Sequence, residues 1–162
     1  MHRQLKVAFW CLGIPALCVW GLAQRFYIGF DPQQPSCLFT HWYLVDTWDK
    51  DIARGNLMAY EMLRADTKIP QGTRLVKVVR AVSGDTVDID RYSITVNKSK
   101  PIPLFFGELP IIVEQAPEEL ERRLTVPASE VFLSGTTRFS YDSRFWGTVS
   151  TDAIIGRAYA LF

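Results

Sequence analysis

Few residues in this chain have a type and spacing suited to chemistry, and a lysine is the strongest of them. The chain has no C-x-x-C, H-E-x-x-H, G-x-G-x-x-G or phosphate-binding-loop motif, so we expect neither a metal nor a cofactor. The histidines are His2 and His41, and His41 lies only five residues from Ser36, too close for the usual layout of a Ser-His-Asp triad. A lysine is therefore the candidate general base.

A lysine accepts a proton from a hydroxyl or a thiol only in its neutral form. The pKa of such a lysine must fall from about 10.4 to roughly 7–8, which burial among apolar groups achieves. Lys77 has the matching environment, because the stretch Leu75–Val79 surrounds it with aliphatic residues. A lysine in an alternating strand can equally point to solvent, and periodicity alone leaves both orientations open for Lys77.

Most of the chain after residue 28 is predicted to form short strands, so we expect a mainly β fold. The segments are rich in apolar or β-branched residues and are bounded by Gly, Asp or Asn turns. Two of them predict a hairpin whose alternating aliphatic residues face one core. The expected strands are Trp42–Val45, Asn56–Glu61, Arg74–Val82, Thr86–Asp90 with Ser93–Asn97 as the hairpin, Val131–Ser134 and Ile154–Ala160.

The segment 98–127 breaks this pattern with five prolines and an apolar patch at residues 104–106. We expect an insertion or lid there, and a surface loop whose Phe residues fill the core is the alternative. Pro117–Leu124 predicts a short helix, because proline occupies the first turn and acidic residues follow it.

The N-terminus predicts a membrane anchor. Residues 1–6 form a short basic tail, and Val7–Ala23 is an uncharged apolar run close to the length that a helix needs to cross a bilayer. We expect an anchor over residues 7–28, with residues 1–6 in the cytoplasm and 29–162 outside it, because basic residues favour the cytoplasmic side. Small residues at 21 and 23 also fit a signal cleavage site, which is the alternative.

Composition and cysteine usage narrow the function classes. The net charge is +1 and the basic residues are scattered, so we expect no nucleic-acid partner. The hydrophobic share of 48% excludes a disordered chain. Cys11 and Cys18 lie in the apolar run, which leaves Cys37 without an intrachain partner outside the membrane, so no disulfide framework is expected.

Four segments resemble the boxes of the signal peptidase I family, in the correct order over residues 36–158. LVKVVRAVSGDTV (75–87) resembles the lysine box, with Gly84 and Asp85 at the family's spacing from Lys77. SYDSRFWG (140–147) matches the S-x-D-S-R-x-W-G core of the last box, which closes with IGRA (155–158). RGNLMAY (54–60) is similar to the middle box. The resemblance implies a signal-peptidase-like antiparallel β-domain with one N-terminal transmembrane helix and a short inserted helix.

The resemblance also implies a role for each matched residue. Lys77 is implied as the general base and Ser140 as the residue that orients its amine. Asp142 and Arg144 are implied as a structural ion pair that holds the loop carrying Ser140. The family's usual G-D-N-R appears here as residues 134–137, SGTT, so the conformation of that loop departs from the pattern.

The nucleophile of the family is a serine near the membrane, and here the register allows two residues. Counting back from residues 43–45 in the conjugative-transfer pattern places Cys37 in the nucleophile position. Ser36 takes that position only if the loop carries one extra residue. A neutral lysine deprotonates a thiol more easily than a hydroxyl, and a degenerate, inactive enzyme is the third alternative.

The resemblance is nearest to the conjugative-transfer (TraF-type) branch. It implies a serine-type, or cysteine-substituted, leader peptidase of the bacterial inner membrane with its catalytic domain in the periplasm. Its expected partners are the lipid bilayer and a leader-bearing exported protein, such as a pilin precursor. The alternatives are a non-catalytic assembly component of the transfer apparatus and a self-cleaving or peptide-binding relative with the same fold.

Overall fold

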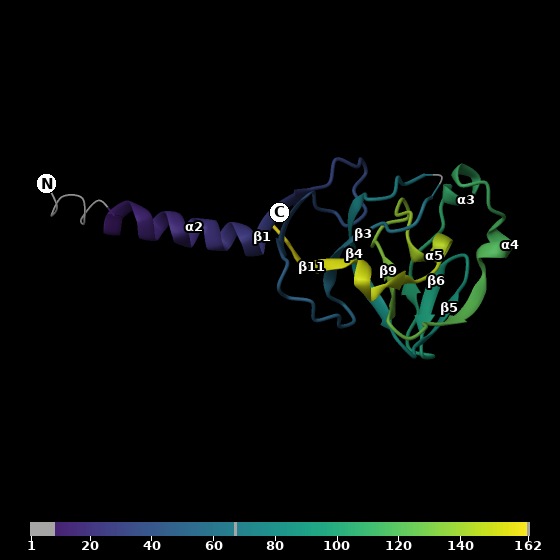
Figure 1. The fold of residues 1–162 in the computed structure, drawn as a ribbon. Coiled ribbons are helices and arrows are strands. Elements are labelled where there is room, and N and C mark those ends of the chain that lie inside the picture. Colours follow the sequence, from purple (N-terminus) through teal and green to yellow (C-terminus); the bar gives the residue numbers. More distant parts are fainter. Residues whose placement is uncertain (1–8, 67, 162) are drawn as a thin grey trace, which may run out of the picture.

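An N-terminal helix projects from a body built of two β-sheets (Figure 1). The structure is a computed structural model and describes residues 9–66 and 68–161, so the predicted basic tail, residues 1–6, lies outside the described residues. The larger sheet has seven strands in the order β1-β2-β11-β3-β4-β9-β10, and the smaller has four in the order β7-β6-β5-β8. Neighbouring strands in both sheets pair antiparallel, which confirms the mainly β prediction.

Seven of the strands were predicted, with bounds that agree to within one residue, and four were not. The seven-stranded sheet contains β1 (Phe26–Phe30), β2 (Trp42–Asp46), β3 (Leu57–Glu61), β4 (Arg74–Val82), β9 (Glu130–Ser134), β10 (Val149–Ser150) and β11 (Ile154–Ala160). The four-stranded sheet contains β5 (Thr86–Ile89), β6 (Ser93–Val96), β7 (Ile102–Pro103) and β8 (Arg122–Thr125). The predicted hairpin is β5 and β6, in which Val87 lies opposite Val96 and Ile89 opposite Ile94, all four buried.

The segment 98–127 belongs partly to the second sheet. Its strands β7 and β8 form the two edges of that sheet, and Leu104 and Phe106 pack into the core beside β5 and β6. Between these strands lie two short helices, α3 (Leu109–Ile112) and α4 (Pro117–Leu120).

The predicted helix over Pro117–Leu124 is therefore half wrong. The helix ends at Leu120, which is buried, and Arg122–Thr125 becomes β8. Pairing with β5 overrides the helical composition of this stretch, because the backbone of β8 completes the ladder at the open edge of β5. The pair is reinforced where Arg123 contacts Asp88 directly across the two strands.

The N-terminal helix ends three residues before the predicted end of the anchor. Its described part consists of η1 (Phe9–Gly13) and α2 (Ile14–Arg25), and the next residues, Phe26–Phe30, form β1. The chain leaves the helix there because β1 pairs along its length with β2, while Arg25 Nε donates to Asp46 Oδ1 at 2.9 Å. Within residues 9–66 and 68–161, the structure contains no helix with the length and apolarity needed to cross a bilayer.

Candidate active site

Lys77 is buried in the middle of the seven-stranded sheet. It lies on β4, which is paired on one side with β3 and on the other with β9. Met58 is its partner across β3, and its neighbours Val78 and Val79 are buried. Only 3% of Lys77 is exposed. Of the two orientations that periodicity left open, the structure therefore has the one in which the lysine points away from bulk solvent.

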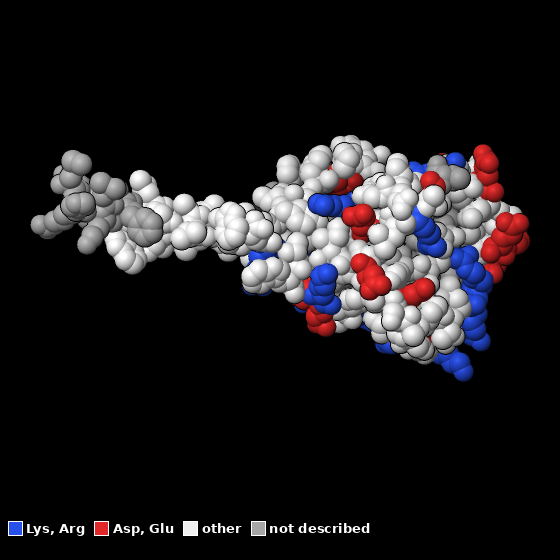
Figure 2. Space-filling view, in the orientation of Figure 1, with Lys and Arg blue, Asp and Glu red and all other residues white. Residues whose placement is uncertain are grey.

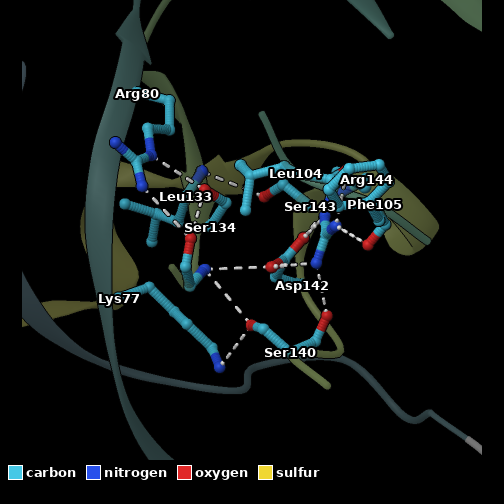
Figure 3. A network of polar contacts seen from close by, with 11 residues as sticks. Lys77, Arg80, Leu104, Phe105, Leu133, Ser134, Ser140, Asp142, Ser143 and Arg144 are labelled. Carbon is cyan, nitrogen blue, oxygen red and sulfur yellow. Dashed lines mark hydrogen bonds and ion pairs between the residues drawn. The ribbon is translucent and has the colours of Figure 1, made fainter. Parts of the chain in front are cut away.

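The amine of Lys77 is held by Ser140. Lys77 Nζ donates to Ser140 Oγ at 3.0 Å, and the hydroxyl also accepts from the backbone N–H of Gly135 at 3.2 Å (Figure 3). Ser140 is fully buried. The same Gly135 N–H is 2.9 Å from Asp142 Oδ2. One backbone N–H therefore connects the serine that holds the lysine to the carboxylate behind it.

Asp142 and Arg144 form a buried ion pair behind Ser140. Both side chains are fully buried, and Arg144 binds the carboxylate through Nε at 2.8 Å and Nη2 at 3.0 Å. Burial alone would raise the pKa of Asp142, but the charge and hydrogen bonds of Arg144, with smaller contributions from Lys77 and Ser140, hold that pKa below its ordinary value. The carboxylate is therefore kept ionised.

Arg144 also ties distant segments to the site. Its Nη2 donates to the backbone carbonyl of Ser140 at 2.7 Å, and its Nη1 donates to the carbonyls of Leu104 at 3.1 Å and Phe105 at 2.9 Å (Figure 3). Asp142 additionally caps the short helix α5 (Ser143–Trp146) by accepting from the N–H of Arg144. The pair fixes the loop that carries Ser140 and the segment 98–127 at the same time.

The SGTT segment (134–137) is hydrogen-bonded to the backbone of both candidate nucleophiles. The N–H of Thr136 donates to the carbonyl of Cys37 at 2.9 Å, and Thr137 Oγ1 donates to the carbonyl of Ser36 at 3.3 Å. A Cβ placed on Gly135 would lie 2.3 Å from Ser140 Oγ and 2.8 Å from the Cys37 carbonyl. Glycine at this position therefore allows the Ser140 hydroxyl and the Cys37 backbone to approach one another.

Ser36 and Cys37 are both buried but differ in their partners. Ser36 Oγ donates to the carbonyl of Thr40 at 2.7 Å and accepts from the N–H of Leu38 at 3.2 Å. Cys37 Sγ donates to Gln33 Oε1 at 2.9 Å. Within the part of the chain that the structure describes, neither side chain is hydrogen-bonded to Lys77 Nζ.

Tyr43, on β2, supports the same loop. Its hydroxyl donates to the carbonyl of Thr40 at 3.0 Å. Burial raises the pKa of Tyr43 to about 12, so the phenol stays protonated and keeps this hydrogen bond at neutral pH.

Gly84 and Asp85 lie apart from the lysine network. Gly84 has φ +85° in the turn before β5. The buried carboxylate of Asp85 accepts from Arg54 Nε at 2.8 Å, from the N–H of Val82 at 2.8 Å and from Asn97 at 2.8 Å. Burial acts to raise the pKa of Asp85, and these partners hold it below its ordinary value. The two residues fix the turn that follows β4.

A cleft of about 730 Å³ opens beside Lys77. It is bounded by β1, by the first half of β4 and by the α3 region, and most of its exposed surface is apolar. Gln33, Phe30 and Tyr141 lie on its wall together with Lys77. Its volume and its mostly apolar lining are in the range typical of ligand-binding clefts.

Several site residues were missed by the sequence reasoning. Gln33 and Thr136 contact Cys37, and Arg54 pairs with Asp85. The sequence could have indicated Arg54, because this residue is the first of the RGNLMAY segment. It could not have indicated Gln33 or Thr136, since their contacts depend on how two loops pack together. Among the described residues, no three His, Cys, Asp or Glu side chains are placed to hold a metal.

The family model described as signal peptidase, peptidase S26, matches residues 1–162. No curated protein matches the chain. Among solved structures, a signal peptidase I from Enterococcus faecalis V583 is 20% identical, with a TM-score of 0.46, over 70% of this chain and 99% of that chain.

Proposed function

The chain belongs to the signal peptidase family, peptidase S26, and we propose that it is a leader peptidase in which Lys77 activates Cys37 as the nucleophile. Membership of the family implies endopeptidase activity on substrates that carry a leader peptide. The single observation that carries the proposal is the buried Lys77 amine, 3.0 Å from Ser140 Oγ and open to the apolar cleft.

The choice of Cys37 over Ser36 rests on their hydrogen bonds. The Ser36 hydroxyl is used inside its own loop, where it binds Thr40 and Leu38. The Cys37 thiol instead faces Gln33, a residue of the cleft wall. A thiol is also the easier group to deprotonate with an amine. Ser36 is therefore assigned to loop structure and Cys37 to chemistry.

The reaction follows from these assignments. The neutral Lys77 amine takes the proton of the thiol, and the thiolate attacks the carbonyl carbon of the scissile peptide bond. Ser140 keeps the amine directed at the cleft during this transfer. The protonated amine then returns its proton to the leaving amino group, and water hydrolyses the thioester.

The proposed substrate is an exported protein whose leader ends in small residues at −1 and −3, because shallow apolar pockets admit only small side chains. The resemblance to the conjugative-transfer branch supports a pilin precursor, processed in the periplasm by an enzyme of the bacterial inner membrane. A synthetic pilin precursor and an unrelated secretory precursor would separate these substrates by their relative rates of cleavage.

Membrane association is supported by the exposed apolar surface of the N-terminal helix. No residue of α2 is buried, and the described helix is free of charge until Arg25 (Figure 2). At its base, the exposed rings of Phe30 and Trp42 contact each other with centroids 4.7 Å apart, and Phe39 is 81% exposed. Burial of such a surface in lipid is strongly favourable. We propose that the helix and this aromatic patch hold the enzyme on the bilayer.

The test compares alanine variants of three residues in the full-length chain. Lys77→Ala and Cys37→Ala should each abolish processing of a leader-bearing precursor, whereas Ser36→Ala should retain it. If Ser36→Ala abolishes processing and Cys37→Ala does not, the serine is the nucleophile. Full processing by Lys77→Ala would contradict the peptidase mechanism and favour the non-catalytic assembly component.

A further inference from the structure

Attack by Cys37 creates a negative charge on the carbonyl oxygen of the substrate, and that oxyanion needs hydrogen-bond donors. The backbone N–H of Cys37 is available, because it has no acceptor among the described residues, whereas the next N–H, of Leu38, is occupied by Ser36 Oγ. Pro35, two residues before Cys37, has no N–H to offer. A side chain beside the sulfur is the candidate for a second donor.

Gln33 is placed to supply it. Its carboxamide contacts the thiol, with Oε1 2.9 Å from Cys37 Sγ, and the same residue lines the cleft that Lys77 also lines. The backbone N–H of Gln33 donates to Asp31 Oδ1 at 2.9 Å, which fixes the start of the loop. Gln33 thus contacts the reacting sulfur and also borders the cleft that a substrate would occupy.

The contact seen with the thiol suits only the protonated sulfur. A thiolate accepts hydrogen bonds and cannot donate one, so it repels the carbonyl oxygen of an amide and attracts its NH₂ group. Rotation of the carboxamide about its last torsion exchanges the two groups without moving the backbone. The NH₂ group then faces the sulfur and the adjacent carbonyl oxygen.

We propose that the Gln33 carboxamide is a catalytic donor that stabilises first the Cys37 thiolate and then the oxyanion, an inference that rests on the proposed function. The thiol proton passes to Lys77, the S–C bond forms, and the π electrons of the carbonyl move onto oxygen, where Gln33 Nε2 and the Cys37 N–H donate. Collapse restores the carbonyl, breaks the C–N bond, and the leaving nitrogen takes the proton from Lys77.

Gln34 provides a matched control one residue away. It is the same residue type and is exposed, it does not line the cleft, and its side chain has no hydrogen-bond partner among the described residues. Substitutions at the two positions alter charge and side-chain length identically. A difference between them therefore reports on the contact with Cys37.

The first measurement is steady-state cleavage of a leader peptide by full-length Gln33→Ala, Gln33→Glu, Gln34→Ala and Gln34→Glu. Glutamate keeps an acceptor for the thiol but removes the donor. Both Gln33 variants should lower kcat by about 10²-fold with KM nearly unchanged, and both Gln34 variants should match the parent enzyme. Full activity of Gln33→Glu would mean that only the acceptor matters and would overturn the proposal.

The second measurement isolates the oxyanion. A peptide aldehyde ending in Ala-x-Ala forms a hemithioacetal with Cys37, whereas the corresponding alcohol binds without that bond. Gln33→Ala should weaken aldehyde binding by about 10²-fold and leave alcohol binding unchanged. Equal losses for both ligands would indicate a purely structural role.

Cys37→Ala separates this inference from the function on which it rests. Loss of cleavage in Cys37→Ala, with normal kcat in Gln33→Ala, would overturn the donor role while keeping the peptidase. Normal cleavage by Cys37→Ala would instead refute the nucleophile itself.

Discussion

Lys77 and Arg144 are two buried basic side chains of one network, and they differ in the number and charge of their hydrogen-bond partners. Arg144 uses its guanidinium fully, with two contacts to Asp142 and three to backbone carbonyls. Lys77 has a single neutral partner, Ser140, and no ion pair among the described residues. A guanidinium is always charged and cannot accept a proton, whereas a neutral amine can. The first arrangement suits a structural role and the second a base.

The largest expected effect on cleavage comes from replacing Lys77 with arginine, the residue type at position 144. Lys77→Arg introduces a permanently charged group that cannot accept a proton, so kcat/KM for leader cleavage should fall by about 10³-fold or more. Lys50→Arg, at an exposed position, is the control and should keep its activity. Retained cleavage by Lys77→Arg would remove the distinction drawn between the two side chains.

Breaking the structural pair should be costly in stability. Asp142→Asn leaves the buried Arg144 charge without its carboxylate, and the free energy of unfolding should fall by about 3–5 kcal/mol. Urea denaturation followed by circular dichroism measures this change. Asp152→Asn, at an exposed position of the 3-10 helix η2 (Thr151–Ala153) that precedes β11, is the matched control. A stability loss as small as that of the control would show that Arg144 is satisfied by its carbonyl partners alone.

Removing the partner of the lysine should affect catalysis more than stability. Ser140→Ala deletes the hydroxyl that holds Lys77 Nζ, so kcat should fall by about 10²-fold through misplacement of the amine. Ser140→Thr keeps a hydroxyl and tests whether that group restores rate. If Ser140→Ala cleaves at the parent rate, Lys77 is positioned by its burial alone.

The smallest expected effect is a difference in acid sensitivity. The pKa of Asp142 is lower in the folded chain than in the unfolded chain, so its contribution to stability is present above its unfolded pKa of about 3.9 and is lost as the pH falls through the folded value. Stability measured from pH 5 downward should therefore fall less steeply in Asp142→Asn than in the parent. Parallel acid limbs in the two proteins would contradict the lowered pKa.

Runs of apolar and β-branched residues made most of this fold predictable. Arg74–Val82 and Ile154–Ala160 were predicted with their observed bounds, because both are rich in such residues. Arg122–Thr125 was not, since its charged residues suit a helix and its pairing with β5 depends on a strand 33 to 39 residues earlier in the chain. Pairing between strands that are distant in the chain does not appear as a periodic pattern in the local sequence.

The candidate site likewise contains contacts that the sequence predicted and contacts that it did not. The burial of Lys77 and its contact with Ser140 followed from an apolar strand and a gapless match to a family box. The contact between Gln33 and Cys37 did not follow, because it depends on the path of an irregular loop. Short motifs therefore located the candidate base, whereas the partner of the candidate nucleophile came only from the loop geometry.

The joint between α2 and β1 determines how far the cleft stands from the far end of the helix. No loop separates the last helical residue, Arg25, from the first strand residue, Phe26, and the carbonyl of Arg25 accepts two hydrogen bonds from Thr47. Arg25 Nε also donates hydrogen bonds to the carboxylate of Asp46 on the neighbouring strand. Swivelling would require these bonds to break together with the first rungs of the β1–β2 ladder. The helix is therefore held at a fixed distance from the cleft. Inserting residues at this joint should change that distance, and with it the position at which a membrane-tethered substrate is cleaved.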